Sequence, residues 1–184
     1  ILQRFELEWV SERLELPPAF TPAAFLRSVG RLKHMKRKEV ERKIPELLET
    51  VGLDPSAWTR SVGKFSKGMK QRTGLAAALM GDPDLLILDE PTDGIDPMGR
   101  AQTREVIRAA NQRGATVFLN SHLLAETERV CDHVAVLSRG KLVLSGRIDE
   151  LKKKDAYTVV FHLEESADAD ALDPPDLRRY AVRH

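Results

Sequence analysis

The sequence predicts an α/β fold with a parallel sheet core, a helical subdomain and the start of a C-terminal extension. Over residues 21–80, apolar side chains recur at helical spacing. From Leu85 onward the pattern changes to strand, helix, strand, with apolar runs at 85–89 and 116–120 that we interpret as buried strands. Because strands joined through a helix pair in parallel and are covered by helices, this order of elements indicates a parallel sheet.

Three helices are predicted before the first of these strands. Thr21 and Pro22 provide an N-cap and a first-turn proline for the first helix. The second is apolar at helical spacing over 40–51, and Pro45 inside it is expected to kink it or to cost about 3 kcal/mol. The third spans 66–80, with a serine at its N-cap.

Shorter elements are predicted after residue 89. Asp96 and Pro97 begin a helix that ends at Gly114. The other predicted elements follow in chain order: a helix at 123–131, a hairpin of strands 134–138 and 141–145, a helix at 148–154, a strand at 156–163 and an acidic linker at 164–175.

Composition places the chain among ordinary globular domains. It has 184 residues, of which 42% are hydrophobic and 31% charged, and its net charge of +1 gives no reason to expect nucleic-acid binding. The run 31–43 is locally basic, which we interpret as a solvated helix face. Cys131 is the only cysteine, so a reducing compartment is expected. No apolar run reaches the roughly 18 residues needed to span a bilayer.

Two adjacent acids, Asp89 and Glu90, directly follow the first predicted strand. At the edge of a sheet one carboxylate can hold a hydrated Mg²⁺, while its neighbour polarises a water for attack on phosphate. This is the chemistry of nucleoside triphosphate hydrolysis. The phosphate loop G-x-x-x-x-G-K-[ST] is absent, since in residues 63–70 Met69 and Lys70 stand where its last two residues belong. We expect that loop upstream of Ile1.

Three segments together resemble a known family. FSKGMKQR at 65–72, LLILDEPTDGIDP at 85–97 and LNSHLLAE at 119–126 are similar to the signature motif, the Walker B strand with D-loop, and the switch-histidine motif of ATP-binding cassette (ABC) ATPases. They occur in the order and at the spacing of that family. The resemblance covers residues 11–151 and implies a P-loop NTPase fold that uses ATP and Mg²⁺.

The resemblance implies roles around the ATP γ-phosphate. Asp89 would order the Mg²⁺ shell, and Glu90 would be the general base toward the attacking water. His122 would contact the γ-phosphate. Glu12 would stand where the family has a phosphate-sensing glutamine.

A second group of residues would serve a facing ATPase domain. Ser66, Lys67, Gly68 and Met69 lie at the start of a helix, where free N–H groups favour an anion, and the family places this motif against the nucleotide of the partner domain. The motif differs from the commonest LSGGQ form at Lys67 and Met69. Asp96 would cap its helix and lie at the interface of the paired domains.

The resemblance also divides the chain into four segments. They are the Q-loop region with a remnant of the core at 1–20, the helical subdomain at 21–64, the core with the signature helix, Walker B, D-loop and H-loop at 65–151, and an incomplete C-terminal extension at 152–184. The helical subdomain would dock on a membrane permease.

The function implied is that of the ATP-hydrolysing subunit of an ABC transporter, of the exporter type. We expect a transmembrane permease partner, a homodimer of ATPase domains, and a cytoplasmic location, peripheral on the inner face of the membrane. Without the phosphate loop the 184 residues alone are predicted to be inactive. Alternatives are a soluble ATPase acting on ribosomes, which would have tandem cassettes, a chromosome-maintenance ATPase, which would have a long coiled coil before the signature, and a non-catalytic remnant.

Overall fold

The computed structural model describes residues 6–12 and 14–153, which fall into two compact units divided between Cys131 and Asp132. Each unit is described by itself. The strand expected at 156–163 and the linker expected at 164–175 lie outside the described residues, as does nearly all of the expected extension at 152–184.

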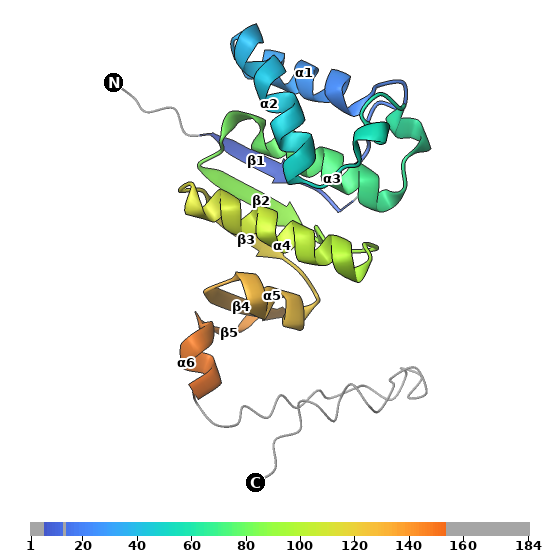
Figure 1. The fold of residues 1–184 in the computed structure, drawn as a ribbon. Helices are drawn as coiled ribbons and strands as arrows, with labels where there is room; N and C mark the ends of the chain where they lie inside the picture. Colours follow the sequence, from blue (N-terminus) through green and yellow to red (C-terminus); the bar gives the residue numbers. More distant parts are fainter. Residues whose placement is uncertain (1–5, 13, 154–184) are drawn as a thin grey trace, which may run out of the picture. The chain divides into compact units, whose positions relative to one another are not determined.

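The first unit contains a parallel sheet of three strands in the order β1, β2, β3 (Figure 1). Strands β2 (Leu85–Asp89) and β3 (Thr116–Asn120) have their predicted bounds, and the predicted parallel pairing is confirmed. Strand β1 (Leu7–Val10) was not predicted. It has only four residues at the edge of the sheet, and an acid interrupts its apolar pattern, so neither length nor periodicity identifies it.

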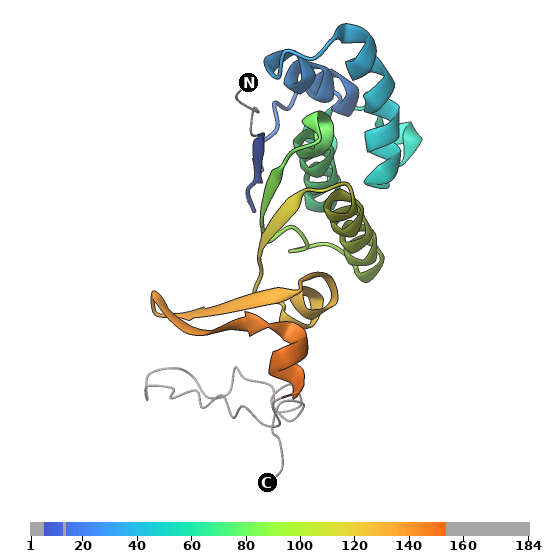
Figure 2. The ribbon, with the colours of Figure 1, turned by 90° about the vertical axis from the view of Figure 1, so that its left-hand side faces the viewer.

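Only one face of the sheet is covered by described helices. Helices α3 (Lys67–Ala78) and α4 (Pro97–Gln112) pack on the face formed by Leu86 and Leu88, which are fully buried (Figure 2). On the opposite face, Trp9 and Phe118 are each 63% exposed. The expectation that β3 is a buried strand is therefore wrong on this face, because no described element of the first unit covers it.

A helical hairpin precedes helix α3. Helices α1 (Pro22–Leu32) and α2 (Arg37–Thr50) pack on each other and on α3. The Thr21 hydroxyl accepts a hydrogen bond from the Ala24 N–H at 3.2 Å, which confirms the predicted cap. Helix α2 continues through Pro45 as one element. The hairpin and the sheet share one hydrophobic core.

Short helices connect these parts of the first unit. Single turns of 3-10 helix lie before helix α3 at η1 (Pro55–Ala57) and η2 (Val62–Lys64) and after it at η3 (Leu79–Gly81). Helix α5 (Leu124–Val130) follows β3 and packs against α4.

The second unit contains the predicted hairpin. Strands β4 (His133–Ser138) and β5 (Lys141–Arg147) pair antiparallel, and helix α6 (Ile148–Lys153) follows. Arg139 and Gly140 both have positive φ, 49° and 73°, as a type I′ turn requires. The turn predicted from this dipeptide is confirmed.

Candidate functional site

The two acids lie at the end of the central strand of the sheet. Asp89 is the last residue of β2 and is in register with Asn120, the last residue of β3. The Asn120 Nδ2 donates a hydrogen bond to Asp89 Oδ1 at 2.7 Å. Sequence reasoning missed this partner, although the carboxyl ends of adjacent parallel strands meet at one edge of a sheet. The amide therefore fixes one oxygen of the Asp89 carboxylate.

Glu90 turns sharply away from the strand. Its φ of 47° is in the left-handed region, which non-glycine residues rarely adopt. The Glu90 N–H still donates to the Asn120 carbonyl at 2.9 Å, so the sheet pairing extends to this residue. With this conformation the Asp89 carboxylate contacts Asn120, while the Glu90 carboxylate contacts His122. Backbone strain of this kind is common at functional sites.

Glu90 and His122, which are 32 residues apart in the sequence, are in direct contact. Glu90 Oε1 accepts a hydrogen bond from the His122 backbone N–H at 2.9 Å and lies 2.9 Å from the ring Nδ1. The Glu90 side chain is 15% exposed and that of His122 is 63% exposed. The structure thus brings together two of the residues that the sequence predicted to act on the γ-phosphate.

The second carboxylate oxygen of Glu90 has no hydrogen-bond partner among the described residues. Glu90 Oε2 is buried and makes no hydrogen bond with any described residue. A buried acceptor without a donor is costly, and native proteins keep few of them. One oxygen is thus held by the His122 backbone N–H, and the other has unused hydrogen-bonding capacity but is closed to solvent in this arrangement. A general base needs a free carboxylate oxygen, and a water reaches this one only when the side chains around it move.

Asp89 is suited to a hydrated Mg²⁺. This ion is usually held by one or two carboxylates together with waters and substrate phosphates, and does not need a cage of protein ligands. Only one oxygen of Asp89 is engaged by Asn120. Within residues 6–12 and 14–153 no group of three or more His, Cys, Asp or Glu side chains could hold a metal ion by itself.

Ser66 caps helix α3 as predicted. Its hydroxyl accepts a hydrogen bond from the Met69 N–H at 3.3 Å, in the usual N-cap arrangement. A Cβ added to Gly68 would lie 3.7 Å from Ile95 Cγ1, an ordinary contact, so the first turn packs closely on the segment after β2. Within the described residues, no hydrogen bond or ion pair joins Ser66, Gly68 or Met69 to Asp89 or Glu90.

Lys67 connects helix α3 to that same segment. Its ammonium forms an ion pair with Asp93, and Glu12 Oε1 lies 4.0 Å from Lys67 Nζ. The lysine stem crosses over Gly94, whose φ is +67°, and a Cβ there would lie 3.0 Å from Lys67 Cδ. The Lys67 ammonium, with a smaller contribution from His122, holds the pKa of Asp93 below its usual value. Asp93 was not predicted, and Lys67 in this structure contacts protein carboxylates.

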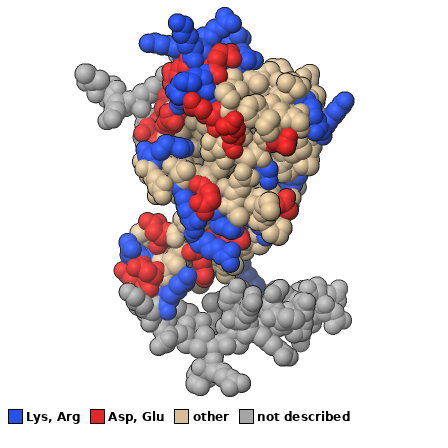
Figure 3. Space-filling view, in the orientation of Figure 1, with Lys and Arg blue, Asp and Glu red and all other residues tan. Residues whose placement is uncertain are grey.

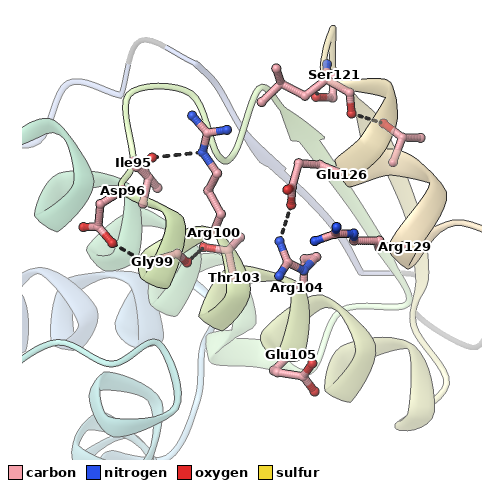
Figure 4. A network of polar contacts seen from close by, with 12 residues as sticks. Ile95, Asp96, Gly99, Arg100, Thr103, Arg104, Glu105, Ser121, Glu126 and Arg129 are labelled. Atoms are coloured by element: carbon pink, nitrogen blue, oxygen red, sulfur yellow. Dashed lines mark hydrogen bonds and ion pairs between the residues drawn. The ribbon is translucent and has the colours of Figure 1, made fainter. Parts of the chain in front are cut away.

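Asp96 caps helix α4, which confirms the structural half of its predicted role. Asp96 Oδ1 accepts a hydrogen bond from the Gly99 N–H at 2.7 Å, and Arg100 Nε donates to the Ile95 carbonyl at 3.0 Å (Figure 4). The Gly99 N–H, with a smaller contribution from the Arg72 guanidinium, holds the pKa of Asp96 below its usual value.

Replacing Asp96 by alanine is expected to lower the unfolding temperature at about pH 7, and the difference from the wild type should narrow at about pH 3. A carboxyl whose pKa is lowered by folding stabilises the protein above its unfolded pKa, and this contribution is lost as the pH falls through the folded value. Thermal unfolding of both proteins at the two pH values tests this. Glu49→Ala, which removes an exposed carboxylate from α2, is the control, and an equal deficit at both pH values would contradict the capping role.

Helix α5, which follows His122, is tied to α4 by charged side chains. Arg104 forms an ion pair with Glu126, and both side chains are mostly buried (Figure 4). Arg108 also donates a hydrogen bond to the Arg129 carbonyl at 2.6 Å. These contacts were not predicted, because the pairing depends on how two helices pack and leaves no signal in sequence spacing. They hold α5, which follows His122, against α4.

Comparison with known proteins identifies relatives of one kind. The profile of the ABC transporter family matches residues 2–93. The bacitracin transport ATP-binding protein of Bacillus licheniformis is 45% identical over 130 residues, covering 70% of this chain and 42% of that protein. The Nod factor export ATP-binding protein I of Rhizobium leguminosarum is 43% identical over 146 residues, covering 79% of this chain and 47% of its own length.

An uncharacterised ABC transporter ATP-binding protein of Nostoc sp. is 44% identical over 144 residues, covering 78% of this chain and 43% of its own length. The chain therefore spans less than half the length of these curated relatives. A solved structure of the ATP-binding subunit of an ABC transporter superimposes with a TM-score of 0.72 at 30% identity, covering 80% of this chain and 61% of that one.

Proposed function

The chain belongs to the ABC transporter family, and on that premise we propose that it supplies the general base and the signature helix of an exporter ATPase. The observation that carries the proposal is the contact between Glu90 and His122, with Glu90 Oε2 buried and unpartnered. Once side-chain movement admits a water to this oxygen, the carboxylate can accept the proton of the water as it attacks the γ-phosphate of ATP.

The residues divide the work of hydrolysis. Mg²⁺, when bound, neutralises charge on the phosphates. Asp89 offers it a carboxylate that is oriented by Asn120. Glu90 takes the proton of the attacking water, and His122, held by its backbone N–H to Glu90, presents its exposed ring to the γ-phosphate. The left-handed conformation of Glu90 keeps the two adjacent acids in separate roles.

A second copy of the chain is part of this proposal. Ser66 and Gly68 stand at a helix start that makes no described contact with Asp89 or Glu90, so they are free to serve the nucleotide of a facing subunit. Asp96 would lie between the two subunits. Dimerisation is then required for activity, since each site takes residues from both copies.

The exporter assignment is supported by the names of two relatives, which act in bacitracin transport and Nod factor export. We propose a transmembrane permease as partner, docking on the helical subdomain at 21–64, and a cytoplasmic location at the membrane surface. The described part of the chain has no helix long and apolar enough to cross a membrane. A soluble ATPase acting on ribosomes stays the second candidate.

The 184 residues contain no G-x-x-x-x-G-K-[ST] motif, so this polypeptide by itself is expected not to hydrolyse ATP. A chimera in which the phosphate-loop segment of the Bacillus licheniformis relative is joined ahead of residue 1 is expected to hydrolyse it. Phosphate release by the two proteins, measured side by side, tests this. Turnover by the 184 residues alone, or none by a folded chimera, would overturn the proposal, and stimulation of the chimera by ribosomes would favour the second candidate.

A further inference from the structure

Basic side chains gather at the end of the first unit where α1 and α2 meet. Figure 3 shows Lys and Arg side chains covering this end. Residues 27–43 include eight lysines and arginines and two glutamates, whereas the whole chain has a net charge of only +1. We name this surface the basic corner and define it by five residues: Arg27, Arg31, Lys36, Arg37 and Lys38.

Three other basic residues of the stretch 27–43 form ion pairs with acids, so they are not counted in the basic corner. Lys33 pairs with Glu8, and Lys43 pairs with Asp82. Arg42 pairs with Glu46 at 2.9 Å along α2. The charges of these three side chains are therefore balanced within the protein.

Four cations of the basic corner are not neutralised in this way. Arg31, Lys36, Arg37 and Lys38 are all exposed, and none forms an ion pair with another residue in the described ranges. Unpaired like charges repel one another, and this repulsion is relieved when an anion binds between them. The basic corner is therefore complementary to an anionic partner.

The corner is also hollowed. A cavity of about 70 Å³ lies between the helices, lined by Arg27, Arg31, Met35, Arg37, Val40 and Glu41. Arg27 and Glu41 form a bidentate ion pair at 2.6 and 2.9 Å across it, and the Arg27 guanidinium, with smaller contributions from Arg37 and Arg31, holds the pKa of Glu41 below its usual value. Arg31 and Arg37 form no ion pair of their own among the described residues, so their guanidinium groups keep their N–H donors for a ligand. Guanidinium groups match the geometry of phosphate oxygens.

The helices that present these arginines are held close together. A Cβ added to Gly30 would lie 2.6 Å from Val40 Cγ2, so only glycine allows α1 and α2 to approach this closely. His34, in the turn between them, has a φ of 58°. The packing of α1 and α2 thus sets the backbone positions of Arg31 and Arg37.

An exposed apolar side chain adjoins the basic corner. Leu32, the last residue of α1, is 79% exposed, and Met35 in the turn is half-buried at the cavity. Basic residues around an exposed apolar side chain are typical of surfaces that lie on membranes, where the cations meet headgroup phosphates and the apolar group enters the interface. Free phosphate gives Leu32 no such environment.

We propose that the basic corner binds the phosphate groups of anionic phospholipids through Arg31 and Arg37, with Leu32 in the membrane interface. This contact rests on the proposed function only for its cellular setting, since it uses none of the residues assigned to ATP. It would place the helical subdomain against the inner leaflet beside the permease.

Sedimentation of the full chain with vesicles tests the proposal. Binding is expected to vesicles of phosphatidylcholine with about one third phosphatidylglycerol and not to phosphatidylcholine alone, and it should weaken as salt is raised. The double variant Arg31→Gln/Arg37→Gln is expected to bind about thirtyfold more weakly, because each cation near an anionic surface contributes about a factor of five. The single variant Leu32→Ser should bind vesicles more weakly than the wild type, and its binding should depend on salt as that of the wild type does.

Matched controls make the outcomes decisive. Arg113→Gln/Lys141→Gln removes two exposed cations elsewhere and should leave vesicle binding unchanged. Thermal unfolding of each variant shows that the fold is retained. Equal binding by the two double variants, equal binding to both kinds of vesicle, or tighter binding to inorganic phosphate or to a glutamate-rich peptide than to vesicles would overturn the proposal. ATP hydrolysis by the chimera is a separate measurement, so either idea can fail without the other.

Discussion

Replacing Glu90 by glutamine is expected to reduce the kcat of the phosphate-loop chimera by about 10²–10⁴-fold, the usual contribution of a general base. The amide keeps the shape of the side chain and can still accept the His122 backbone hydrogen bond. It lacks the unpartnered carboxylate oxygen that takes the proton from water. ATP binding should survive, so the variant should accumulate with ATP bound and not with ADP.

A matched glutamate separates this effect from a general loss of charge. Glu105 lies on α4 and forms a surface ion pair with Arg108. Glu105→Gln should leave kcat unchanged. Steady-state phosphate release and analysis of the retained nucleotide are the two measurements. Near-normal turnover by Glu90→Gln would remove Glu90 from the role of base.

Replacing Leu88 by alanine is expected to reduce the free energy of unfolding by about 2–5 kcal/mol, the range for deleting a buried leucine side chain. Leu88 is fully buried under the helices and directly precedes Asp89 on the central strand. The cavity left behind cannot collapse easily, because the neighbouring strands hold β2 on both sides. Urea denaturation of the 184-residue chain measures the change.

Phe118 provides the contrast on the opposite face of the sheet. It is larger than leucine but 63% exposed, so Phe118→Ala should cost at most about 1 kcal/mol. Losses of similar size for Leu88→Ala and Phe118→Ala would mean that another element covers this face, and that the sheet is not one-sided in this chain.

Much of the fold could be predicted because local signals coincide with it. Strands β2 and β3 have the predicted bounds, and Thr21, Ser66 and Asp96 each cap the predicted helix. A cap or a turn depends on a few neighbouring residues, so the sequence alone identifies it. Strand β1 was missed since its four residues are defined by pairing with β2, which follows it by more than seventy positions.

The sequence identified which residues belong to the candidate site, but it did not predict the contacts that they make with one another. The acids and His122 could be named from the sequence, yet the Glu90 to His122 hydrogen bond and the unpartnered oxygen depend on the left-handed conformation of Glu90. The Lys67 to Asp93 pair was missed for a similar reason, because it joins a helix start to a turn 26 residues away. Such contacts arise from packing, which periodicity does not encode.

The most direct test of the central claim is a crystal structure of the Glu90→Gln chimera with ATP and Mg²⁺. If Asp89, Glu90 and His122 form one half of a nucleotide site, the ion should lie at the Asp89 carboxylate, the γ-phosphate at the His122 ring, and Ser66 and Gly68 of a second copy should close the site from the other side. ATP bound with its γ-phosphate away from His122, or an ion away from Asp89, would contradict the account.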